Sequence, residues 1–65
     1  MIQQTVTPQH MAAALIAHYG STRLAHERMP SIKHSTIYRI AIGESTRIQK
    51  RTVRALERAY KRIAP

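Results

Sequence analysis

The chain has 65 residues and a formal net charge of +8, so it can form only one small domain with a limited core. Because it has no cysteine, it can form neither a disulfide framework nor a thiolate metal site. No apolar run approaches the roughly 20 residues that cross a bilayer, and the first residues lack the pattern of a secretory signal, so we expect a cytoplasmic protein.

The first predicted helix follows a polar, unpatterned start. We expect residues 1–6 to form a flexible N-terminal arm and residues 7–65 to form the domain. Thr7 and Pro8 are typical of a helix start, because threonine caps the helix and proline at its first position loses no hydrogen bond. The alanine-rich run that follows predicts a helix that ends at Gly20.

A second, short helix is predicted from its N-cap, Ser21, to about Arg28, with Leu24 and Ala25 facing inward. A small inward residue lets two crossing helices approach closely. Pro30 cannot continue this helix and biases the residue before it away from helical geometry.

A third helix is predicted to open at Ser31 or Lys33 and to run to about Ile42, where Gly43 stops it. One of its sides is apolar. The other side carries four hydrogen-bonding side chains, His34, Ser35, Tyr38 and Arg39. Two short helices joined by a break, the second with a polar outward side, are how many proteins insert a helix into the major groove of DNA.

The last helix is predicted to begin near Gln49, or at Thr52 acting as a cap, and to reach Ile63. Its apolar seam consists of Val53, Leu56, Tyr60 and Ile63. Its other side carries Lys50, Arg51, Arg54, Arg58, Lys61 and Arg62. The sequence thus predicts an all-α domain of four helices, or of five with a short extra turn, and no strands. We expect the seam to close the core and to leave Ile48, Tyr60 or Ile63 at its edge for a partner subunit.

The charge is concentrated in the second half of the chain. Residues 1–30 carry two arginines and one glutamate, a net charge of +1. Residues 31–65 carry nine lysines and arginines and two glutamates, a net charge of +7. A basic half favours a polyanionic partner, nucleic acid before an anionic membrane surface, over a merely soluble basic face.

The segment from Ser21 to Ile42 resembles the helix-turn-helix of the Cro and phage-repressor family, whose fold is lambda-repressor-like. The resemblance is carried by Leu24–Ala25, by the string Ser-Thr-Ile-Tyr-Arg-Ile over residues 35–40, and by Gly43. With the flanking helices it covers about residues 8–63. The turn over residues 28–32 departs from the family, because it lacks a glycine and is about two residues longer.

The resemblance implies DNA contacts. Base edges would be contacted from the recognition helix by Lys33, His34, Ser35 and Arg39. Phosphates would be contacted by Ser21, Thr22, Arg23, Tyr38, Thr46 and Arg47. Arg51 and Arg54 would both add sequence-independent affinity. Plainer alternatives are an ion pair of Arg39 with Glu44 or Glu27, packing of Tyr38 against the last helix, and Ser21 acting only as a cap.

Other chemistry finds little support in the sequence. The four histidines, His10, His18, His26 and His34, recur every eight residues, which is not the spacing of three or four that pairs two imidazoles on a helix. We therefore expect no metal and no cofactor. No base stands near a nucleophile, so we expect neither an enzyme nor a small-molecule substrate.

The sequence therefore predicts a sequence-specific transcriptional regulator, most simply a phage or mobile-element repressor in the cytoplasm of a bacterial host. It would insert helix 33–42 into the major groove of double-stranded DNA and bind a palindromic operator as a homodimer, with half-sites about 34–36 Å apart. The alternatives are a protein-interaction module, such as a phage-encoded inhibitor or antitoxin, a basic RNA-binding module, and a last helix lying on a membrane surface.

Overall fold

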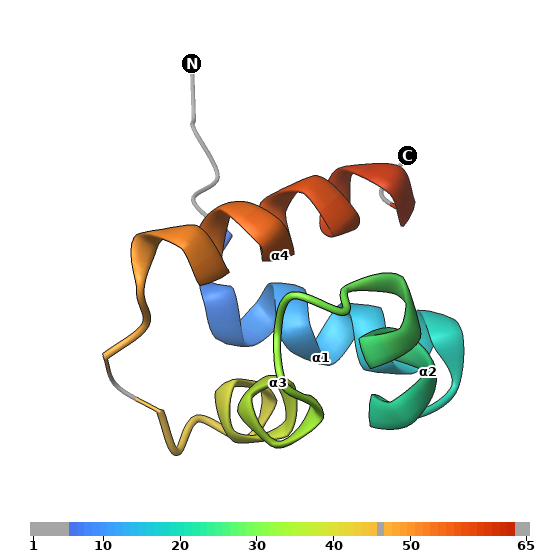
Figure 1. Ribbon diagram of the computed structural model, residues 1–65, viewed down its shortest axis with the longest axis horizontal. Coiled ribbons are helices and arrows are strands. Elements are labelled where there is room, and N and C mark those ends of the chain that lie inside the picture. The colour runs from blue at the N-terminus through green and yellow to red at the C-terminus, as the bar shows by residue number, and fades with distance from the viewer. Residues whose placement is uncertain (1–5, 46, 64–65) are drawn as a thin grey trace.

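The computed structural model describes residues 6–45 and 47–63, which form four α-helices and no strand (Figure 1). The helices are α1 (Pro8–Tyr19), α2 (Thr22–Arg28), α3 (His34–Ala41) and α4 (Lys50–Ile63). This confirms the predicted all-α architecture. Of the arm predicted over residues 1–6, only Val6 is described, and it packs against the core.

Local capping signals explain where the first two helices begin and end. The Thr7 side chain accepts a hydrogen bond from the His10 backbone N–H at 3.1 Å, and Ser21 does the same for Leu24 at 3.1 Å. Between them Gly20 takes the left-handed conformation, with φ of 102°, and donates its N–H to the Ile16 carbonyl at 2.8 Å. Only two residues therefore separate α1 from α2, as the sequence predicts.

The start of each later helix matches one of its two predicted positions. Lys33, not Ser31, is the cap residue of α3, and it lies in an extended conformation. Helix α4 begins at Lys50, so Thr52 lies inside the helix and does not cap it.

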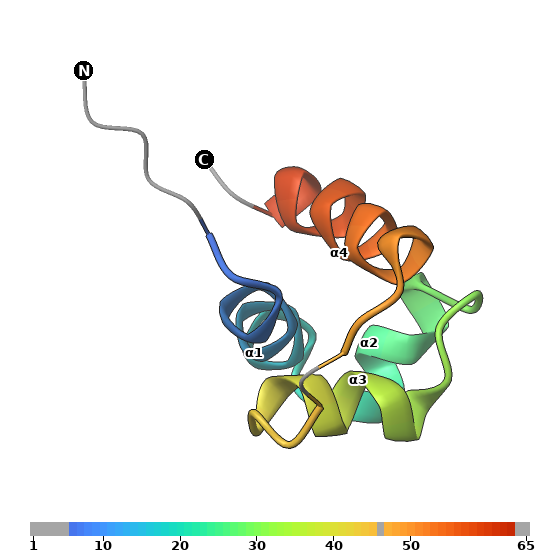
Figure 2. The ribbon, with the colours of Figure 1, turned by 90° about the vertical axis from the view of Figure 1, so that its left-hand side faces the viewer.

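Helix α1 is the centre of the arrangement, because α2, α3 and α4 all pack against it, and α2 also packs against α3. Figure 1 views α3 almost along its axis, whereas α1 and α4 run across the picture, so α3 crosses both. In Figures 1 and 2 alike, α4 lies at the top and α3 at the bottom. The outer sides of α3 and α4 therefore face in opposite directions. No helix within the described residues is both long and apolar enough to span a membrane.

The core draws on all four helices and on the turn between α2 and α3. Its ten buried residues are Met11, Ala12, Leu15, Ala25, Met29, Ile32, Ile37, Ile40, Leu56 and Ala59. The prediction that Leu24 faces inward is wrong, since 45% of it is exposed. A helix of seven residues presents one narrow side to its neighbours, and Ala25 occupies it.

The seam of α4 lies deeper on one side than predicted. Leu56 and Ala59 are buried, whereas Val53 is only half-buried. The three residues expected at its edge for a partner subunit are half-buried and pack against this chain's own core: Ile48, Tyr60 and Ile63. The seam therefore closes the core of this chain, which is the role that the sequence favours over a dimer surface.

Candidate nucleic-acid interface

Helix α3 is strongly two-sided. Ile37 and Ile40 are buried almost completely, which anchors the helix to α1 and α2. The polar side chains of the other side are all exposed: His34, Ser35, Tyr38 and Arg39. Their fixed backbone and solvent-facing side chains are what a helix needs in order to enter a groove of DNA.

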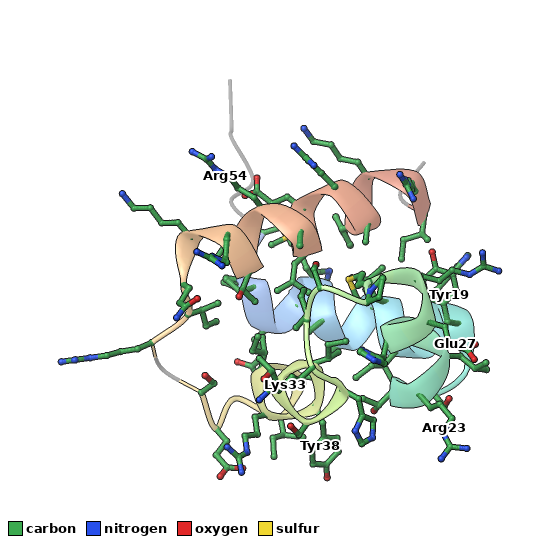
Figure 3. All side chains as sticks on the ribbon, in the orientation of Figure 1. Tyr19, Arg23, Glu27, Lys33, Tyr38 and Arg54 are labelled. Atoms are coloured by element: carbon green, nitrogen blue, oxygen red, sulfur yellow. The ribbon has the colours of Figure 1, made fainter. Side chains whose placement is uncertain are left out.

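The N-terminal end of α3 is open to a ligand. Lys33 is its cap residue, is exposed, and makes no capping hydrogen bond with its side chain (Figure 3). The backbone N–H groups of a first helical turn attract anions when no side chain caps them. Lys33 adds a full positive charge at the same place.

The long turn before α3 is held by side-chain contacts where a glycine would normally give a tight turn. Met29 and Ile32 are buried under the chain, and the Ile32 N–H donates to the Met29 carbonyl at 3.0 Å. The half-buried His26 side chain on α2 places its Nδ1 2.6 Å from the Ile32 carbonyl oxygen. With the proton on Nδ1, this hydrogen bond ties α2 to the residue before Lys33 and thereby fixes where α3 starts.

Replacing His26 with alanine should loosen this turn. The lost hydrogen bond is worth about 1 kcal/mol, which for a domain of this size corresponds to a fall in Tm of roughly 4–8 °C. His34→Ala is the matched control, because His34 is exposed at the start of α3 and the exchange removes the same imidazole. Thermal unfolding followed by circular dichroism would measure both. Equal Tm values for the two variants would contradict a structural role for the His26 contact.

A polar cleft of about 430 Å³ lies between the start of α3 and the segment leading into α4. Its cations are Lys33, Arg47 and Arg51. Its hydroxyl groups come from Ser31, Thr36, Ser45 and Thr52. Cations and hydroxyl donors on one concave surface suit phosphate oxygens. Thr46, predicted as a phosphate contact, lies outside the described residues.

The sequence does not single out Arg51 as part of this cleft. It assigns Arg51 and Arg54 to one basic side of the last helix, because residues three apart are neighbours on a helix surface. In the structure Arg51 borders the cleft with Lys33, whereas Arg54 points away from α3 on the far side of the molecule (Figure 3). Of the two arginines, Arg51 is therefore the better placed to meet a duplex lying on α3, and only the packing of α4 reveals the difference.

The residues predicted at the start of α2 divide by their surroundings. The Ser21 hydroxyl is already used as the cap of α2, and both Ser21 and Thr22 are half-buried. Arg23 is exposed and points to the same side of the molecule as Tyr38 (Figure 3). Arg23 is therefore the member of this group best placed to meet a duplex lying on α3.

Tyr38 lies over an apolar depression of about 280 Å³ that is also lined by Ala13, Ile16, Ala17, Thr22, Ala41 and Ile42. The alternative in which Tyr38 packs against the last helix is wrong, because the side chain points away from α4 (Figure 3). With 53% of it exposed, its hydroxyl remains accessible on the outer side of α3. The Tyr38 ring therefore packs beside α1, and its hydroxyl remains free to donate a hydrogen bond to a phosphate.

The histidines do not form a common site. The His10 ring meets Tyr60 edge-on, with ring centroids 6.0 Å apart, and His18 does the same with Tyr19 at 4.9 Å. Within the described residues no three potential metal ligands come together.

Comparisons with models of protein families, with curated proteins and with solved structures returned no match. The likeness of residues 21–42 to a phage-repressor helix-turn-helix thus rests on the residues that carry it.

Proposed function

We propose that this chain is a sequence-specific DNA-binding transcriptional regulator that inserts α3 into the major groove. The observation that carries the proposal is the exposed polar side of α3, held rigidly by buried Ile37 and Ile40 and flanked by the cationic cleft at its N-terminal end. A rigid helix provides direction for base contacts, and the surrounding cations provide affinity for the phosphate backbone.

Each exposed side chain has a chemical role in this proposal. Lys33 and Arg39 donate to guanine O6 and N7, and Ser35 and His34 can pair with several bases. The phosphates on either side of the groove are held by cations from three different segments: Arg23, Arg47 and Arg51. Helix α3 is about 12 Å long, comparable with the width of the major groove.

A helix of this length contacts few base pairs. The proposal therefore includes a homodimer on a palindromic operator, which doubles the number of base contacts and sets the distance between half-sites. Bound across a promoter, such a dimer would exclude polymerase, as expected of a phage or mobile-element repressor in a bacterial host.

Selection of binding sequences from random duplex DNA at physiological salt tests the proposal. We expect enrichment of a palindrome whose half-sites are centred about 10–10.5 base pairs apart, or a multiple of that spacing. Sedimentation of the selected complex should give two chains per duplex. Failure to enrich any sequence would contradict the proposal, even if the protein retains general affinity for DNA.

A further inference from the structure

The outer side of α4 is a second cationic surface, separate from the one around α3. All its lysines and arginines are exposed, and its only acidic residue is Glu57. Lys50, Arg54 and Lys61 share its centre, because positions four and eleven residues apart lie on nearly the same line along a helix. We call these three residues the outer strip. It extends over about 16 Å of helix.

The outer strip faces away from a duplex that lies on α3. Helix α4 lies at the top and α3 at the bottom of Figures 1 and 2, and the buried side of α4, with Leu56 and Ala59, is turned toward the core. Figure 3 shows Arg54 pointing away from the molecule on the side opposite Tyr38. Whatever neutralises the outer strip is therefore a different molecule, or a different segment of the same one.

Like charges at this spacing repel one another along a helix, and α4 carries two such pairs four residues apart that include the outer strip: Lys50 with Arg54, and Arg54 with Arg58. One glutamate cannot neutralise them. A polyanion bound to this surface would offset the repulsion between the cations. The surface therefore favours a partner with closely spaced negative charges.

The side chains on the outer side of α4 fit one kind of polyanion better than others. A helix that binds a membrane surface inserts apolar side chains, but the apolar side of α4 is occupied by the core. Single-stranded RNA needs aromatic side chains for stacking, and the one aromatic residue of α4, Tyr60, is half-buried beside His10. A surface whose three cations outnumber its single glutamate, Glu57, and that offers no free apolar or aromatic side chain suits the phosphate backbone of a duplex.

We infer that the outer strip of α4 binds duplex DNA without regard to sequence, so that one chain can hold two duplexes on opposite sides. The inference goes beyond operator binding through α3 and rests on the proposed function only in that α3 must also hold a duplex, with or without sequence preference.

A capture assay tests the inference. A random-sequence duplex fixed to beads is saturated with protein and washed, and the amount of a second, fluorescent duplex that it retains is measured. The wild-type protein should retain the second duplex, and Arg54→Gln/Lys61→Gln should retain about tenfold less. The double variant Arg28→Gln/Arg62→Gln is the matched control, since it removes the same charge at a depression beside the α2–α3 turn.

Three outcomes would overturn the inference. They are no capture by the wild-type protein, undiminished capture by the outer-strip variant, and equal loss in the control variant. Undiminished capture would mean that a dimer bridges the duplexes through its two α3 helices. Because the assay uses random duplexes, absence of an operator preference leaves its result unaffected, and the two proposals fail separately.

Discussion

Replacing Arg39 with alanine is expected to remove most of the preference for the selected operator over random duplex. Arg39 is exposed on α3, one turn beyond the N-terminal polar residues, where its guanidinium can pair with a guanine in bidentate fashion. Such a pair discriminates against the wrong base by about 1–3 kcal/mol, or roughly 5- to 150-fold in affinity. Fluorescence anisotropy at one fixed salt concentration would measure the affinity for both duplexes.

Arg51→Ala is the control that separates base contacts from phosphate contacts. Arg51 borders the cleft beside Lys33 and is expected to meet phosphate. Its loss should weaken operator and random duplex by the same factor and lower the slope of log affinity against log salt by about 0.9. If Arg39→Ala and Arg51→Ala changed both affinities alike, α3 would not be the element that distinguishes sequences.

The boundaries of the first two helices can be predicted because their signals are local. Thr7, Gly20 and Ser21 each form their capping hydrogen bond with a residue three or four positions away. The start of α4 has no comparable side-chain signal. The sequence predicts a start near Gln49 or at Thr52, and the helix begins at Lys50, next to the first of these.

The inward side of a short helix is harder to predict than its ends. Leu24 and Ala25 are neighbours in sequence, and hydrophobicity favours burying the larger residue. The close crossing of α1 over α2 admits only the smaller one, so Ala25 is fully buried and Leu24 is left at the surface.

Some features of the candidate site can be predicted from the sequence, and others cannot. The polar side of α3 follows from helical periodicity alone, and its exposure is as predicted. The contact of His26 with the Ile32 carbonyl joins a side chain to a backbone atom across a turn, which no periodicity shows. The separation of Arg51 from Arg54 likewise depends on the rotation of α4 about its own axis.

Replacing Leu15 with alanine is expected to unfold much of the protein at room temperature. Leu15 is on α1, the helix against which the other three pack, and its side chain is 0% exposed. The exchange leaves a cavity and costs about 2–5 kcal/mol. A chain of this length has a total stability of only about 3–10 kcal/mol. Urea unfolding followed by circular dichroism would measure the loss.

Leu24→Ala makes the same chemical change at a site that is 45% exposed. It should cost less than about 1 kcal/mol, because most of the removed surface was already in water and alanine favours the helix. The difference between the two losses in free energy of unfolding therefore measures how much the packing of Leu15 on α1 contributes to stability. Comparable losses would mean that α2 buries Leu24 after all, and the position of α2 beside α3 would have to be revised.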